Sequence, residues 1–219
     1  MADAVKVLFL IMSALFPIVD PLTGAPIFLA LTREYSQETR RALSQKVAAD
    51  SFILMMGSYF IGSHVLGFFG ISLPVVQVGG GLVVAATGWM LLTQNDTSRD
   101  TTRTSIQSQD AFKQAFYPLT LPLTVGPGSI SVAITLGANS THRYGVHVLI
   151  ILAAIIAMAL IAASIFICYA FAGRLVKVLG DTGVTVTIRL SAFLLVCIGV
   201  QIMWNGVSTL LSSIPLTVR

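Results

Sequence analysis

Two segments of this chain carry the same spacing of prolines inside long apolar runs, at an offset of 101 residues that takes Pro17 to Pro118. They read FPIVDPLTGAP at 16–26 and YPLTLPLTVGP at 117–127, and they hold six of the eight prolines. Proline inside a helix lacks an N–H donor and clashes with the carbonyl four residues earlier. Three prolines in each segment therefore predict an interrupted helix rather than a bent one, and predict it twice.

The composition places these segments in a membrane. The chain is 55% hydrophobic and 10% charged, whereas a soluble domain has about 25% charged residues. Apolar runs of about 20 residues recur, long enough to cross a hydrocarbon core of about 30 Å. We predict an all-α membrane protein with the lipid bilayer as partner, and the net charge of +4 does not indicate nucleic acid, since the charges lie in loops. The expected spans are about 5–31, 47–69, 73–92, 116–137, 146–171 and 185–211.

A long polar stretch divides the six expected spans into two halves. We expect a first three-helix repeat at 1–92, a cytoplasmic linker at 93–115 and a second three-helix repeat at 116–219, all in one membrane domain. Three spans per half is an odd number, so the second repeat must be inverted relative to the first. A weaker match at an offset of 111 aligns Gly88 with Gly199. The glycine run 79–81 predicts close helix packing.

The distribution of basic residues predicts the orientation, because cytoplasmic loops are rich in Lys and Arg. Ten basic residues fall on one side, namely Arg33, Arg40, Arg41, Lys46, Arg99, Arg103, Lys113, Arg174, Lys177 and Arg189. Three fall on the other, namely Lys6, Arg143 and Arg219. Both termini are therefore expected on the outer, periplasmic side.

The interrupted helices are the predicted substrate site, because irregular backbone at membrane depth survives only in protein or along a polar cavity. Pro26 and Pro127 suit the first position of a restarted helix. Free N–H groups there would attract an anion and freed carbonyls a cation, which suits a small zwitterion such as an amino acid. Gly24, Gly126 and Gly128 would admit a ligand close to the backbone. The alternative is that both segments are only kinks that help helices pack.

The residues expected to bind substrate come from both segments. They are Pro17, Asp20, Pro21, Thr23, Gly24, Ala25, Pro26, Ile27, Pro118, Pro122, Thr124, Gly126, Pro127, Gly128 and Ser129.

Two acidic residues are candidates for coupling transport to a proton or ion. Asp20 lies at membrane depth, where an ionisable residue is a functional hypothesis by default. It could bind the substrate ammonium or a proton, or it could cap the restarted helix. Asp50 could relay protons or pair with Lys46 four residues earlier.

An enzyme has little support, so no catalytic residue is expected. The motifs HExxH and GxSxG and a Walker loop are absent, and no His/Cys cluster has metal-ligand spacing. Gly126-Pro127-Gly128-Ser129 is faintly similar to an intramembrane serine protease, but that chemistry needs a His on another helix, and the sixth span has none. We expect no metal and no cofactor.

Segments 16–32 and 122–131 resemble the two hallmark segments of the MarC family of bacterial and archaeal membrane proteins. The resemblance covers essentially the whole chain, although position 20 is commonly Asn in that family. It implies a SnatA-type transporter of small neutral amino acids such as glycine, alanine or serine, in the bacterial inner membrane. It also implies a three-plus-three inverted repeat and dependence on a proton or sodium gradient. An exporter of amino acids or other small solutes, or a non-transporting membrane component, remains the alternative.

Overall fold

A computed structural model describes residues 2–93, 115–144 and 148–213, and every regular element in these ranges is a helix. The predicted all-α class is therefore confirmed, whereas the predicted linker lies almost wholly outside the described residues. The elements are α1 (Ala2–Val19), α2 (Pro21–Leu31), α3 (Gln37–Phe68), α4 (Leu73–Thr93), η2 (Ala115–Thr124), α6 (Pro127–Tyr144), α7 (Val148–Ala170) and α8 (Ala172–Ser212).

Five helical segments in the described ranges are long and apolar enough to cross a membrane. They are Asp3–Leu31, Gln37–Phe68, Leu73–Thr93, Val148–Ala170 and Thr182–Ser212. The fourth expected span, at 116–137, does not qualify, because it is divided between η2 and α6 and because α6 continues into a polar sequence at 139–144.

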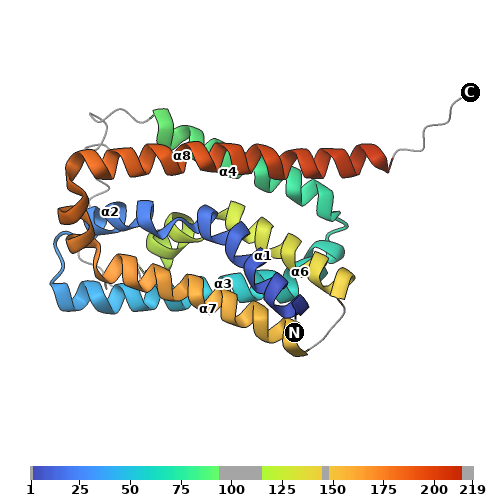
Figure 1. Cartoon of the computed structure of the whole chain (residues 1–219), viewed down its shortest axis with the longest axis horizontal. Helices are drawn as coiled ribbons and strands as arrows, with labels where there is room; N and C mark the ends of the chain where they lie inside the picture. Colours follow the sequence, from blue (N-terminus) through green and yellow to red (C-terminus); the bar gives the residue numbers. More distant parts are fainter. Residues whose placement is uncertain (1, 94–114, 145–147, 214–219) are drawn as a thin grey trace, which may run out of the picture.

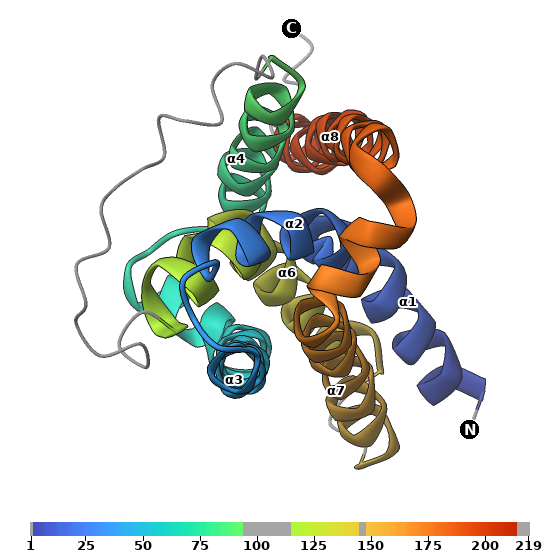
Figure 2. The same ribbon diagram turned by 90° about the vertical axis from the view of Figure 1, so that its left-hand side faces the viewer.

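The helices form three layers. Figures 1 and 2 show α4 and α8 on one side and α3 and α7 on the other, with α1, α2, η2 and α6 between them. Helix α4 packs mainly against α8, α6 contacts α3 and α4, and α2 contacts α7 and α8. Both proline segments therefore lie in the central layer, between two layers of longer helices.

Figure 1 also shows the direction of each helix. Helices α1 and α2 run from right to left in that view, and α6 runs from left to right. Likewise α3 runs opposite to α7, and α4 runs opposite to α8. The start of α1 and the end of α8 lie at the same end of the bundle.

Two helices extend beyond their apolar runs. Helix α3 begins at Gln37, ten residues before the predicted start at 47, because Ser36 caps it by accepting a hydrogen bond from the Thr39 N–H at 3.2 Å. Helix α8 begins at Ala172 and bends at Gly180, whose φ of 66° suits glycine. The expected spans at 47–69 and 185–211 lie within the candidate membrane spans Gln37–Phe68 and Thr182–Ser212, apart from Phe69, and the helices are longer because hydropathy detects only the apolar part of a helix.

Glycines bring α4 and α8 into backbone contact, which confirms the packing predicted for the glycine run. A Cβ on Gly81 would lie 2.6 Å from the carbonyl oxygen of Gly199, and a Cβ on Gly199 would lie equally close to that of Gly81. A Cβ on Gly88 would lie 2.7 Å from the carbonyl oxygen of Ala192. Gly79, in contrast, has no atom within 4 Å of that position.

Large apolar side chains cover the outside of the bundle. Such a surface would be unstable in water but suits contact with lipid. Exposed examples are Phe9, Ile53, Ile61, Trp89, Met90, Leu152, Phe193 and Trp204.

Candidate functional site

The first break is a single residue, Asp20, which separates α1 from α2. Its φ of 41° and ψ of 66° are left-handed, and it is the one non-glycine residue with positive φ in the described ranges. Asp is among the residues that tolerate this conformation. Pro21 occupies the start of α2, where its missing N–H costs nothing to α2 but leaves the carbonyl of Pro17 without a helical donor.

The helix therefore restarts earlier than predicted. Pro17 lies inside α1 and Pro26 lies inside α2, so the expected restart at Pro26 was wrong. The N–H groups expected to be free near it belong to the interior of α2. The physical reason is that Pro21 suits a first helical position as well as Pro26 does, and the turn at Asp20 places the start there.

Asp20 caps α2 and leaves two polar atoms without partners. Its Oδ1 accepts a hydrogen bond from the Thr23 N–H at 3.3 Å, which confirms the capping role. Its Oδ2 and the Oγ1 of Thr23 are buried, and neither has a hydrogen-bond partner among the described residues. Buried polar atoms are nearly always paired, and an unpaired one costs about 1–3 kcal/mol. Two neighbouring acceptor atoms are thus available to a cationic or hydrogen-bonding ligand.

The second break extends over several residues of η2. Tyr117 (φ −130°, ψ 123°) and Leu121 (φ −106°, ψ 126°) are extended, and each precedes a proline, Pro118 and Pro122, whose ring disfavours helix in the residue before it. Leu121 is the position that the offset of 101 aligns with Asp20. The backbone therefore leaves the helix at the same place in both segments.

Threonine hydroxyls pair with carbonyls at the second break. Thr120 Oγ1 donates to the Ala115 carbonyl and Thr124 Oγ1 donates to the Leu119 carbonyl, each at 2.7 Å. These hydroxyls therefore pair with carbonyls of the interrupted segment.

Helix α6 restarts at Pro127, as predicted. The N–H groups of Gly128 and Ser129 lie in its first turn, where no carbonyl of the same helix can accept them. The preceding residue is Gly126, which has no side chain to cap them. Within 2–93, 115–144 and 148–213 these two N–H groups have no hydrogen-bond partner, whereas the start of α2 is capped by a carboxylate.

Tyr169 on α7 contacts both segments, and its role was not predicted. Its side chain is fully buried, and its hydroxyl lies 2.9 Å from Thr124 Oγ1. Its ring stacks on Phe28 of α2, with centroids 4.6 Å apart and planes at 20°. A Cβ on Gly24 would overlap its hydroxyl. The signal in the sequence is a phenol hydroxyl within a strongly apolar helix, which needs a buried partner.

The remaining predicted residues differ in burial. Thr23 and Ser129 are almost inaccessible. Gly128 faces Val84 of α4, whose side chain a Cβ on Gly128 would overlap, so this glycine serves helix packing. Only the backbone of Pro118 and Pro122 is described. Pro21, Gly24, Ala25 and Thr124 are buried, Pro17, Asp20, Pro26, Ile27 and Gly126 are half-buried, and Pro127 is exposed.

Asp50 on α3 does not pair with Lys46, so that part of the prediction was wrong. The one ion pair in the described ranges joins Lys6 to Asp3 on the surface, at 3.4 Å. The Oδ2 of Asp50 is buried without a hydrogen-bond partner in the same ranges, while Lys46 is exposed. The long lysine side chain reaches solvent instead of the carboxylate.

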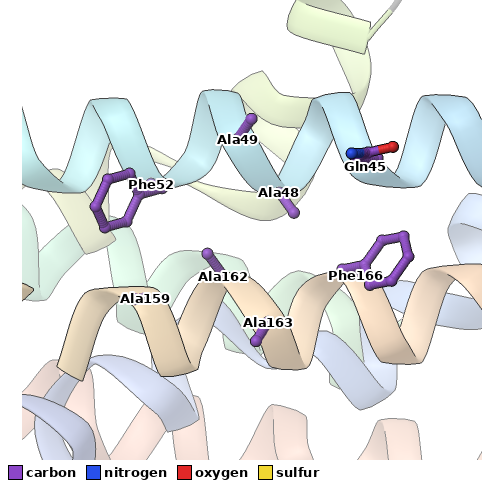
Figure 3. Close-up of a pocket in the computed structure, with 8 residues that line it drawn as sticks. All are labelled: Gln45, Ala48, Ala49, Phe52, Ala159, Ala162, Ala163 and Phe166. Atoms are coloured by element: carbon purple, nitrogen blue, oxygen red, sulfur yellow. The ribbon is translucent and has the colours of Figure 1, made fainter. Parts of the chain in front are cut away.

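A cavity of about 300 Å³ lies elsewhere, between α3 and α7 (Figure 3). Apart from Gln45 its lining is apolar, with alanines between Phe52 and Phe166. None of the residues predicted to bind substrate lines it. Among the described residues, no three His, Cys, Asp or Glu side chains gather as metal ligands would.

The long apolar helices and lipid-facing surface define a multi-span helical membrane protein. The profile of the MarC family integral membrane proteins matches residues 5–211, and the chain belongs to that family. The UPF0056 inner membrane protein MarC of Salmonella typhimurium is 32% identical over 216 residues, which cover 94% of this chain and 96% of that protein. The MarC protein of Escherichia coli O1:K1 is 31% identical, with the same coverage of both chains. No solved structure matches significantly.

Proposed function

We propose that this protein is a secondary transporter of small neutral amino acids such as glycine, alanine and serine. The observation that carries the proposal is the complementary chemistry of the two breaks. Among the described residues, the first break has unpaired acceptors on Asp20 and Thr23, and the second has donors without a cap on Gly128 and Ser129. Tyr169 contacts both segments. Acceptors and donors on neighbouring segments suit the ammonium and carboxylate groups of one zwitterion.

The substrate carboxylate binds at the start of α6 and the ammonium binds beside Asp20. An anion at the start of α2 would meet the Asp20 carboxylate, which already occupies that helix end. At the start of α6 no carboxylate of the described residues occupies the N–H groups of Gly128 and Ser129. An ammonium group has three donors, enough for Asp20 Oδ2, Thr23 Oγ1 and one carbonyl freed by a proline.

Two inverted three-helix repeats of a six-span bundle would provide alternating access around these breaks. The opposite directions of α1 and α6, of α3 and α7, and of α4 and α8 support this arrangement (Figure 1). The contacts support it too, because α6 packs on α4 as α2 packs on α8. At the offset of 111, Gly81 corresponds to Ala192 and Gly88 corresponds to Gly199. Gly81 contacts Gly199, and Gly88 contacts Ala192. The two contacts are therefore equivalent when the two halves are exchanged.

The end of the bundle at which α2 ends and α8 starts is the cytoplasmic end in this proposal (Figure 1). The basic residues of 32–46 and 173–189 adjoin it. The start of α1 and the end of α8 then face the periplasm. The names of the relatives support an inner-membrane location. A proton or a sodium ion drives transport, with Asp20 and Asp50 as coupling groups, and no catalytic step is involved.

Purified protein in proteoliposomes tests the proposal with a panel of labelled amino acids, with and without a pH or sodium gradient. We expect gradient-dependent movement of glycine, alanine and serine. Vesicles of known orientation distinguish an importer from an exporter. Failure to move any amino acid under every gradient would overturn the proposal and favour a non-transporting membrane component.

A further inference from the structure

We infer that Tyr169 sets the upper size limit of the transported amino acid. The inference rests on the proposed function, since it concerns the same site. Tyr169 contacts both interrupted segments: its hydroxyl bonds to Thr124 and occupies the place that a Cβ on Gly24 would take. The side chain therefore fills the space directly beside both breaks.

The hydroxyl of Tyr169 is held in one orientation. Thr124 has one hydroxyl proton and donates it to the Leu119 carbonyl at 2.7 Å. Tyr169 must therefore be the donor in the 2.9 Å hydrogen bond to Thr124 Oγ1. This hydrogen bond fixes the tip of the side chain at the second segment.

The ring of Tyr169 is held as firmly as its hydroxyl. It stacks on Phe28 at 4.6 Å, and both side chains have no exposed surface. Phe28 belongs to α2, one turn after Gly24, so the ring also packs against the first segment. A close-packed side chain of this kind cannot move aside without displacing its neighbours, so it forms a rigid wall.

Asp20 lies one turn before Gly24, and the Gly24 N–H donates to the Asp20 carbonyl at 3.0 Å. Because the Tyr169 hydroxyl occupies the place of a Cβ on Gly24, a substrate held at Asp20 lies beside this wall. In this inference the wall admits a hydrogen or a methyl group and excludes a branched side chain such as that of leucine. Replacing Tyr169 with alanine removes the ring and opens the space beside Gly24. One additional methylene changes selectivity by about 10-fold or more in a fitted apolar pocket, so the change in preference should be large.

The test compares leucine and alanine transport in proteoliposomes for wild type, Tyr169→Ala and Tyr59→Ala. Tyr59 is the matched control because it is a buried tyrosine of α3 with no contact to Gly24 or Thr124 among those described. We expect the leucine-to-alanine ratio to rise at least about 10-fold in Tyr169→Ala and to stay at the wild-type value in Tyr59→Ala. Tyr169→Phe retains the ring, so its ratio should stay close to that of wild type.

An unchanged leucine-to-alanine ratio in a folded Tyr169→Ala that still transports alanine would overturn the inference and leave the proposed function intact. Absence of alanine transport in wild type would overturn both together. If Tyr169→Ala does not elute as a folded protein in size-exclusion chromatography, Tyr169→Leu replaces it. That smaller side chain should raise the ratio by a smaller factor, and no rise at all would overturn the inference.

Discussion

The hydroxyl of Tyr169 lies 2.9 Å from Oγ1 of Thr124, so α7 is joined by a buried hydrogen bond to the second interrupted segment. The same ring packs on Phe28 and against Gly24 of the first segment. Two breaks that are 101 residues apart in sequence thus share one side chain.

Thr124→Val should destabilise the protein more than Thr120→Val. Both threonines donate to a carbonyl five residues earlier, but only Thr124 also accepts from Tyr169. Loss of the Thr124 hydroxyl leaves the buried hydroxyl of Tyr169 unpaired, which costs about 1–3 kcal/mol. Thermal unfolding in detergent should show a lower midpoint for Thr124→Val. In a double-mutant cycle with Tyr169→Phe, Thr124→Val should show coupling and Thr120→Val should not. Equal coupling energies for the two threonines would contradict the hydrogen bond between Tyr169 and Thr124.

Asp20→Asn should preserve the fold and weaken substrate binding. Asparagine caps a helix as well as aspartate does and tolerates the left-handed conformation, but it carries no charge for the ammonium. A hydrogen bond to a charged group contributes about 1.5–3 kcal/mol, so the KM for alanine should rise by about 10-fold to 100-fold. Asp20→Ala should in addition lower stability by about 0.5–2 kcal/mol through loss of the cap.

The matched control for Asp20 is Asp3→Asn. Asp3 pairs with Lys6 on the surface, with both side chains more than half exposed, and such pairs contribute little. Its KM should equal that of wild type. A normal KM in Asp20→Asn as well would exclude Asp20 from substrate binding, and an unchanged dependence of its uptake on the proton gradient would exclude it from coupling.

Gly81→Val should prevent normal folding, and Gly79→Val should be tolerated. A Cβ at Gly81 would come within 2.6 Å of the backbone of α8, while a Cβ at Gly79 meets nothing within 4 Å. Overpacking typically costs about 1–3 kcal/mol, and backbone atoms cannot move as side chains do. The yield of monodisperse protein in size-exclusion chromatography distinguishes the two variants, and equal yields would contradict the α4–α8 packing.

Asp50→Asn should abolish gradient-driven accumulation while exchange of amino acid across the membrane continues. Its buried Oδ2 has no partner among the described residues, which makes this carboxylate a candidate for the coupling role. Lys46→Gln is the control, because Lys46 forms no ion pair with Asp50, and it should behave as wild type. Retained accumulation in Asp50→Asn would remove this residue from coupling.

The sequence predicted both breaks, but it predicted the helix start correctly only after the second break, at Pro127. The proline spacing predicts an interruption within 16–26 and within 117–127, and non-helical residues occur in both segments, at Asp20 and at Leu121. The proline spacing could not decide between Pro21 and Pro26 as the start of α2, because the missing N–H and fixed φ of proline suit the first helical position at either residue. That choice depends on the left-handed turn and cap of one residue, Asp20.

The role of Tyr169 could not be predicted from local pattern. Its contacts join α7 to residues 45 and 145 positions earlier in the chain, Thr124 and Gly24, and only tertiary packing brings these together. The glycines of α4 were the opposite case, because a run of residues without side chains predicts close helix contact wherever the partner lies.

The most direct test of the central claim is equilibrium binding of labelled alanine to the purified protein, in competition with propionate and with ethylamine. Each competitor carries one of the two charged groups of alanine. Acceptors at Asp20 and donors at Gly128 and Ser129 require both groups, so neither competitor should displace alanine at concentrations where unlabelled alanine does. Displacement by either compound as effectively as by alanine would contradict a site built from both breaks.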